Sequence, residues 1–214
     1  MDGKVYYITT TLKALVAQLT DQESLDAIEN ALDGYTAQLE PFKKARAEYQ
    51  RKELHMLADE LIRDEILING KPEHITCQKG CAHCCKQIVM VTQPEGARLF
   101  ELAKERGIPL DAGRLERQAV QDDNGWLTLH GDDRNCPFLG SDNTCQVYDD
   151  RPLSCRKYFV VSDPDMCDIE KHPRDKVRVC YSVNAEVLTT AAFTALSSGS
   201  MAQVLLAEIR RAID

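Results

Sequence analysis

Nine cysteines crowd into the middle of this 214-residue chain, between positions 77 and 180. The 76 residues before this stretch and the 34 residues after it contain none. Cysteines distributed through a hydrophobic core would not gather in this way. Thiols placed so close together must be explained either by disulfides or by a bound metal.

Three features favour metal over disulfides. The N-terminus, Met1-Asp2-Gly3-Lys4, does not open a signal peptide, so we expect a cytoplasmic protein whose thiols stay reduced. The number of cysteines is odd, and the adjacent Cys84 and Cys85 are awkward for simple pairing. In a reducing compartment, clustered cysteines are more often metal ligands or redox groups.

Composition and charge limit the kinds of binding partner that we expect. Hydrophobic residues make up 43% of the chain and charged residues 28%, as in an ordinary globular protein. The formal net charge is 26 − 34 = −8, which disfavours nucleic acid and anionic membranes. Because no window of about 18 residues is uniformly apolar, we expect no membrane span. The expected partners are therefore a metal ion or cluster and, through the helical ends, a protein.

The chain divides into three parts, which we expect to form one compact unit. Residues 1–70 are predicted to be helical, with the first apolar stripe at Leu12, Leu15, Val16 and Leu19. A capping box at Thr20 and Glu23 predicts the start of a second helix, which Gly34 interrupts. Pro41 is expected in the first turn of a third helix, which ends at about Ile68.

Residues 71–182 hold every cysteine and are rich in loops. One helix is predicted from Pro94 to the residue before Gly107, a second at 112–120, and a short strand at 126–129. Residues 183–214 return to two helices, separated by the small residues 197–200. The predicted fold is therefore mainly α, a helical framework around a loop-rich, cysteine-clustered segment.

The first cysteine cluster has four thiols in nine residues, Cys77-Gln-Lys-Gly-Cys81-Ala-His-Cys84-Cys85. Short spacings let several thiolates converge on one ion, and Gly80 permits the tight turn that this requires. The side chains of neighbouring residues such as Cys84 and Cys85 usually project in different directions. We therefore expect this pair to serve two ions or one larger cluster.

The second cluster contains Cys136-Pro-x-Leu, Cys145-x-x-Tyr and Arg151-Pro-x-x-Cys155-Arg156. Asp149 or Asp150 is expected to cap a helix whose first turn contains Pro152. Cys155 would then lie near the N-terminus of that helix. There the helix dipole and the flanking arginines favour a thiolate over a thiol, as a metal ligand requires.

Taken together, these motifs resemble the CxxCxxCC cysteine-cluster family, the YkgJ-type domains described as zinc- or iron-chelating, of which flagellin lysine N-methylase is a relative. The resemblance covers about residues 77–180, and the first gap has three residues instead of two. It implies eight ligands, and Cys180 is preferred as the eighth because the family's last cysteine follows the Cys-Arg pair by a helix length. Cys167 is then a spare thiol. The implied metal ligands are Cys77, Cys81, Cys84, Cys85, Cys136, Cys145, Cys155 and Cys180.

The cofactor is expected to be an iron–sulfur cluster or zinc. Eight thiolates can build two tetrahedral zinc sites, and four can hold one [4Fe–4S] cluster. The resemblance to the methylase, which implies an iron–sulfur cluster, favours iron. Three functions remain open: a metal-binding protein, an iron–sulfur enzyme of methyl transfer or redox chemistry, and a structural zinc module for a protein partner.

Other chemical motifs are weaker. The spacing of Cys77, Cys81 and Cys84 also occurs in radical S-adenosylmethionine enzymes, but strands and helices do not alternate here as their barrel requires. No metalloprotease, phosphate-loop or nucleophile-elbow motif is present. His55 is interpreted as a packing residue and His83 as a loop residue that supports the ligands. Tyr148, Tyr158 and Phe159 are expected to pack, or to wall the metal site.

Overall fold

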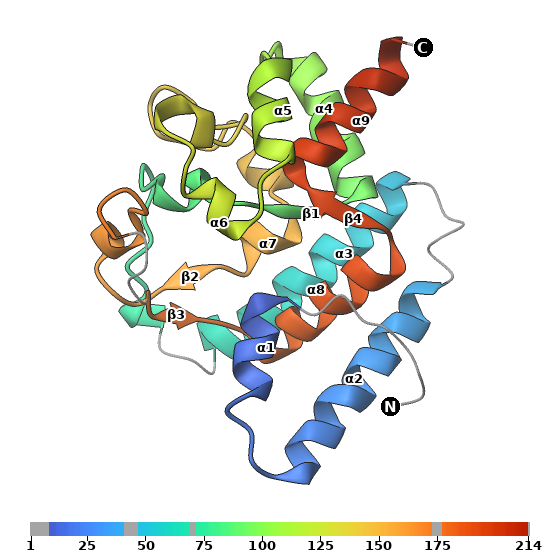
Figure 1. Ribbon diagram of the computed structural model, residues 1–214. Coiled ribbons are helices and arrows are strands. Elements are labelled where there is room, and N and C mark those ends of the chain that lie inside the picture. The colour runs from blue at the N-terminus through green and yellow to red at the C-terminus, as the bar shows by residue number, and fades with distance from the viewer. Residues whose placement is uncertain (1–8, 41–46, 69–71, 173–176, 214) are drawn as a thin grey trace.

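The computed structural model describes residues 9–40, 47–68, 72–172 and 177–213. Among these residues helices dominate and the strands form two short antiparallel pairs, so the prediction of a mainly α fold is confirmed (Figure 1). Within the described ranges, no helix is both long and apolar enough to span a membrane.

The N-terminal part is helical, as predicted. Asp21, rather than Thr20, caps the second helix by accepting a hydrogen bond from the Ser24 amide at 2.7 Å. That helix runs through Gly34 without a break, so the expected interruption is wrong. The predicted position of Pro41 lies outside the described residues. The elements are α1 (Thr10–Val16), α2 (Gln22–Leu39), α3 (Ala47–Ile62) and a π-helical continuation, η2 (Arg63–Ile68), which ends at the predicted residue.

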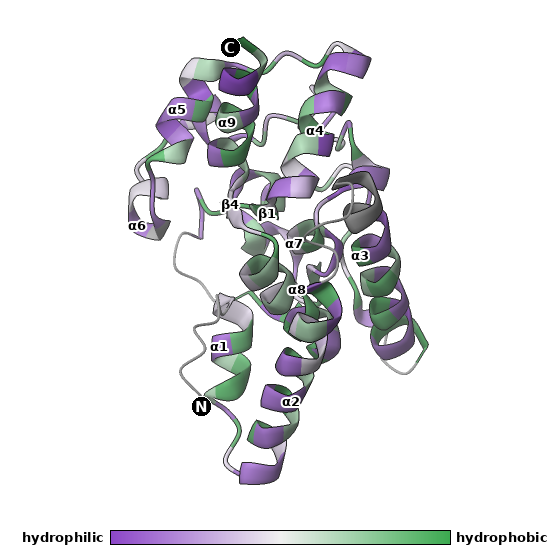
Figure 2. Ribbon diagram, turned by 90° about the vertical axis from the view of Figure 1, so that its right-hand side faces the viewer, coloured by the Kyte–Doolittle hydropathy of each residue, from purple (hydrophilic) through white to green (hydrophobic). Residues whose placement is uncertain are grey.

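Helix α8 (Val183–Ala195) is the central element of the lower half of Figure 1. It is buried along almost its whole length, and it packs against α1, α2 and α3. A helix that is apolar on all sides has to be covered by other elements. Figure 2 shows that α2, in contrast, carries both hydrophilic and hydrophobic residues, as a covering helix requires.

A second helical group lies above it in Figure 1 and is built from α4 (Gln93–Arg106), α5 (Ala112–Ala119) and α9 (Met201–Ile213). The Thr92 and Glu95 pair forms a capping box at the start of α4, and Gly107 ends this helix in the left-handed conformation at φ 64°. Strands β1 (Met90–Thr92) and β4 (Ser198–Ser200) pair antiparallel next to α4 and α9. Gly107 ends α4 as predicted, and α5 lies within the predicted range 112–120.

The cysteine-rich segment consists mainly of single turns, on the left of Figure 1. The prediction of a strand at 126–129 is wrong. Trp126 instead ends a short helix, and its indole donates a hydrogen bond to the Lys86 carbonyl. Asp122, whose side chain accepts from two amides of the first turn, starts this helix. The remaining elements are η3 (Pro72–His74), η4 (His83–Lys86), α6 (Asp123–Trp126), η5 (Gly131–Arg134), η6 (Tyr148–Asp150), α7 (Leu153–Arg156), β2 (Phe159–Val160), η7 (Pro164–Cys167) and β3 (Val179–Cys180).

Candidate metal centre

All nine cysteines lie within the described residues, and each is a free thiol. The first cluster folds as two tight turns. Gly80 adopts φ +86°, a conformation that L side chains rarely take, and the turn of η4 follows. Cys84 and Cys85 are adjacent within η4, and the Cys85 amide is bonded back to the Ala82 carbonyl at 2.9 Å.

A direct backbone contact joins the two cysteine clusters. The amide of Cys136 donates a 2.7 Å hydrogen bond to the carbonyl of Cys85, although 51 positions separate the two residues (136 − 85). Leu139 and Cys145 form an isolated antiparallel bridge. The 136–147 loop is thereby folded back, and Cys136 lies next to η4.

Backbone amides point at the sulfurs of this loop. The Phe138 amide is bonded to Cys136, and the Val147 amide is bonded to Cys145; each bond favours the thiolate. In the first cluster, the Val160 amide donates to Cys77 Sγ at 3.3 Å. Amides that already face sulfur stabilise thiolate ligands of a metal.

Cys155 is presented by the single turn α7, whose start is capped differently from the prediction. Asp149 and Asp150 lie in η6 and do not cap this helix. Instead, the buried Glu95 carboxylate accepts the Leu153 amide at 2.7 Å. The helix is one turn long, and Cys155 lies in that turn as predicted.

Five thiols form what we call the first thiol group: Cys84, Cys85, Cys136, Cys145 and Cys155. A hydrogen bond from Cys85 lowers the pKa of Cys84 to about 7, and the same bond raises the pKa of Cys85. Burial raises the pKa of Cys136 to about 12. Burial, followed by the charges of Cys136, Cys84 and Cys145, raises the pKa of Cys155. These thiols are therefore near enough for each thiolate to repel the next one.

The remaining thiols are Cys77, Cys81, Cys167 and Cys180. Burial raises the pKa of Cys77, and the charges of Cys84 and Cys81 raise it further. Cys167 is 5% exposed, and its pKa is raised to about 11 by burial and by the charges of Cys81, Cys77 and Cys84. Cys180 lies opposite Phe159 in the β2–β3 pair and packs against an apolar cluster.

Cationic side chains near the thiols divide into two kinds. Arg156 forms a bidentate pair with Asp59 at 2.8 and 3.0 Å, and Lys157 forms a buried pair with Glu186 at 2.5 Å. Arg151 instead stacks on the Tyr148 ring, 3.7 Å from its centroid, and its charge lowers the pKa values of Cys84, Cys145 and Cys155. Arg151 thus acts on three thiols of the first thiol group, while Arg114 acts on Cys136 and Arg106 on Cys145.

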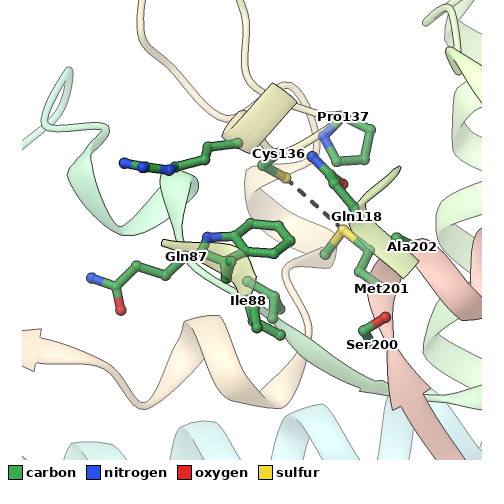
Figure 3. Close-up of a pocket in the computed structure, with 11 residues that line it drawn as sticks. Gln87, Ile88, Gln118, Cys136, Pro137, Ser200, Met201 and Ala202 are labelled. Atoms are coloured by element: carbon green, nitrogen blue, oxygen red, sulfur yellow. Dashed lines mark hydrogen bonds between the residues drawn. The ribbon is translucent and has the colours of Figure 1, made fainter. Parts of the chain in front are cut away.

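A small cavity adjoins Cys136 (Figure 3). Its volume is about 20 Å³, which is room for one water molecule rather than for a substrate. The Cys136 thiol points at Met201 Sδ, 3.9 Å away, and Gln118 lies beside it (Figure 3). Sequence reasoning missed Met201, since the i, i+3, i+4 pattern of α9 marks it only as a core residue.

The donor set suits zinc or iron, because thiolates are the ligands that both metals accept in fourfold sites. In the described part of the chain, no three Cys, His, Asp or Glu side chains meet in the geometry that holds one metal ion. Binding would therefore have to draw neighbouring thiols together. The repulsion among the buried thiolates would be relieved by a cation placed between them.

Comparison with known proteins gives one match. A family model described as "CxxCxxCC: Putative zinc- or iron-chelating domain" matches residues 76–180. This range contains all nine cysteines. No curated protein and no solved structure matches the chain.

Proposed function

We propose, from the premise that residues 76–180 belong to the CxxCxxCC family of zinc- or iron-chelating domains, that this protein holds an iron–sulfur cluster or zinc through its clustered cysteines. Free thiols serve as ligands only in a reducing compartment, so we place the protein in the cytoplasm. The ligands proposed from the motifs are Cys77, Cys81, Cys84, Cys85, Cys136, Cys145 and Cys155, with Cys180 as the eighth member of the predicted set.

One observation carries this proposal. Thiols from η4 and the 136–147 loop are brought together by the 2.7 Å hydrogen bond from the Cys136 amide to the Cys85 carbonyl, although 51 positions separate the two residues (136 − 85). Burial and neighbouring thiols disfavour the thiolate forms of Cys85 and Cys155, and a bound cation would compensate the charge of these thiolates. The amides bonded to Cys136, Cys145 and Cys77 support the same conclusion.

We propose the identity of the metal from the number of thiolates that a cluster requires. Four thiolates suffice for one [4Fe–4S] cluster, and the first thiol group alone supplies them. The resemblance to flagellin lysine N-methylase favours iron over zinc. When bound, such a cluster would supply electron transfer or Lewis acidity, while the chain would supply thiolates, amide hydrogen bonds and the charge of Arg151.

An enzymatic role is the second candidate. Cys77 and Cys84 are exposed, whereas the other seven cysteines are intermediate or buried. A purely structural zinc site is normally closed by four protein ligands, and an open position is a mark of catalytic sites. This exposure favours redox or group-transfer chemistry over a structural module.

The test of the proposed function is anaerobic purification followed by metal analysis and a visible spectrum. A brown protein with broad visible absorption and about four iron atoms per chain is expected for the cluster. A colourless protein with bound zinc would identify the metal as zinc instead of iron and would leave the proposed ligands unchanged. A protein that contains neither metal, with its thiols paired in disulfides, would overturn the proposal.

Two variants test the ligands of the first thiol group. Cys155→Ser is expected to lose most of the bound metal, because serine does not replace a thiolate ligand. Ser154→Ala is the matched control in the same turn: it removes the 2.7 Å hydrogen bond from the Ser154 hydroxyl to the Met90 carbonyl and leaves every thiol in place. Full metal content in Cys155→Ser would exclude Cys155 as a ligand.

A further inference from the structure

Gln118 is a buried polar residue that belongs to none of the cysteine motifs. It lies in the last turn of α5, which packs against α9, and it is 4% exposed. Its side-chain nitrogen donates two hydrogen bonds to the loop that leads into Cys136, one to the Asp133 carbonyl at 2.7 Å and one to the Asn135 carbonyl at 3.0 Å. A buried amide group that binds two carbonyls of one loop fixes that loop to its helix.

The second of these bonds acts on the peptide unit that joins Asn135 to Cys136. The carbonyl of this unit accepts from Gln118, and its amide, that of Cys136, donates to the Cys85 carbonyl at 2.7 Å. Because a peptide unit is planar, holding both of its polar groups fixes the direction in which the chain enters Cys136. One peptide unit thereby connects α5 to η4, the turn that carries Cys85.

The thiol of Cys136 is held from the other side by α9. Its Sγ lies 3.9 Å from Met201 Sδ, and the Met201 amide donates to the Val89 carbonyl at 2.8 Å. Figure 3 shows Gln118, Cys136 and Met201 around the same small cavity. The place of this thiol therefore depends on side chains of α5 and α9 as well as on its own loop.

Other contacts of the same loop have a different character. Arg117, one residue before Gln118, pairs with the Asp133 carboxylate at 2.6 and 2.9 Å, but this ion pair is exposed. Exposed pairs contribute only about 0 to 1 kcal/mol. Arg134 donates from Nη2 to the Leu127 carbonyl at 2.8 Å, within the loop itself. Gln118, in contrast, binds from a buried position and acts on the peptide unit of Cys136.

We infer that Gln118 is a positioning residue of the metal centre, which fixes the peptide unit of Cys136 so that this thiol can bind a metal together with the thiols of η4. The inference rests on the proposed function, in which Cys136 is a ligand. Gln118 itself does not touch the metal. Residues that orient a ligand in this way commonly account for a factor of about 10 to 100 in metal affinity.

The experiment compares Gln118→Met with Gln121→Met in the full chain. Methionine keeps the length of the side chain and removes its two N–H donors. Zinc is added to the reduced, metal-free protein in competition with a chromophoric chelator, and Gln118→Met is expected to bind it about tenfold more weakly or worse. Gln121 is the matched control, because its amide donates to the Arg117 carbonyl at 3.0 Å and not to the loop. Its variant should keep the wild-type affinity, and circular dichroism checks that both variants remain helical.

A second comparison separates positioning from a general loss of stability. In a Cys136→Ser background, Gln118→Met should cause no further loss of zinc affinity, because the thiol through which Gln118 acts is already absent. If Gln118→Met does not fold, Gln118→Asn, which shortens the side chain by one methylene, replaces it in both backgrounds. Unchanged affinity in the folded variant, an equal loss in both backgrounds, or full affinity in Cys136→Ser would overturn the inference. Wild-type protein that binds no zinc, iron or cobalt would instead refute the proposed function.

Discussion

Glu95 is the residue on which several parts of the molecule depend. Its carboxylate is 1% exposed and accepts hydrogen bonds from the Thr92 amide at 2.9 Å and the Leu153 amide at 2.7 Å. It also contacts His55 Nε2 at 3.0 Å, so the histidine that the sequence suggested as a packing residue is a polar partner. One side chain thereby ties α3, the start of α4 and the turn that carries Cys155.

Replacing Glu95 by glutamine is expected to destabilise the protein by about 2 to 4 kcal/mol at pH 7. Glutamine is neutral, and its amide group must place an N–H against one of the two backbone donors. Urea denaturation measures the loss. A change below about 0.5 kcal/mol would show that Glu95 is not a structural anchor.

The same carboxylate makes stability depend on pH. Burial raises the pKa of Glu95, but the hydrogen bond and charge of His55, with the amides of Thr92 and Leu153, outweigh it and hold the pKa below the ordinary 4.5. Its contribution is therefore complete above pH 4.5 and is lost as the pH falls through the lowered value. The stability difference between wild type and Glu95→Gln should shrink on acidification. A difference that grows instead would contradict the assignment.

At the scale of elements, α4 and α9 approach each other closely at Gly96. A Cβ atom built at Gly96 would lie 2.1 Å from Val204 Cγ1 and 3.0 Å from Val204 Cβ. The two helices can approach this closely only because position 96 has no side chain. Their packing in turn holds β1 against β4 and keeps Met201 beside Cys136.

Gly96→Ala is expected to destabilise the protein by about 1 to 3 kcal/mol, despite the helix propensity of alanine. Adding Val204→Ala should make the double variant more stable than the sum of the single effects predicts. Gly34→Ala in α2 is the control, because nothing lies within 4 Å of its Cβ position. It should raise stability by about 0.5 to 1 kcal/mol. Thermal unfolding of Gly96→Ala, Val204→Ala, their double variant and Gly34→Ala tests the contact between Gly96 and Val204.

At the scale of the whole molecule, the first thiol group lies between two hydrophobic cores. Phe138 and Val147, which follow Cys136 and Cys145 by two residues, belong to the core of α4, α5 and α9. Leu153, two residues before Cys155, belongs to the core of α3 and α8. Ions bound to the first thiol group would therefore connect the two cores.

Metal removal is expected to lower the melting temperature by about 5 to 10 °C. This range corresponds to the roughly 2.7 kcal/mol that a ligand contributes at a hundred times its dissociation constant. A chelator added during a thermal melt gives the measurement, and returning the metal should restore the original transition. Trypsin should then cut faster after Lys171, an exposed residue of the η7 loop, in the chelated protein. An unchanged melting temperature would show that the metal does not join the cores.

The sequence by itself determined the features that depend on near neighbours. The helix of residues 93–106 is set by Thr92, Pro94 and Gly107, because caps and breakers act within one turn. The mainly α fold follows from helical periodicity, and the closely spaced cysteines carry the resemblance to a zinc- or iron-chelating family. Local errors, such as the strand at 126–129, arose where Asp122 and the distant Lys86 carbonyl outweighed weak apolar alternation.

Only the tertiary structure decided which distant groups became neighbours. Asp149 and Asp150 are the nearest carboxylates in sequence to α7, yet Glu95, 58 positions from Leu153, caps it. Cys167 and Cys180 look alike in the sequence, and only the packing of η7 on η4, and of β3 on an apolar cluster, distinguishes their surroundings. The physical reason is range: backbone preferences act over a few residues, whereas the meeting of sulfurs and charges depends on how separate loops pack against one another.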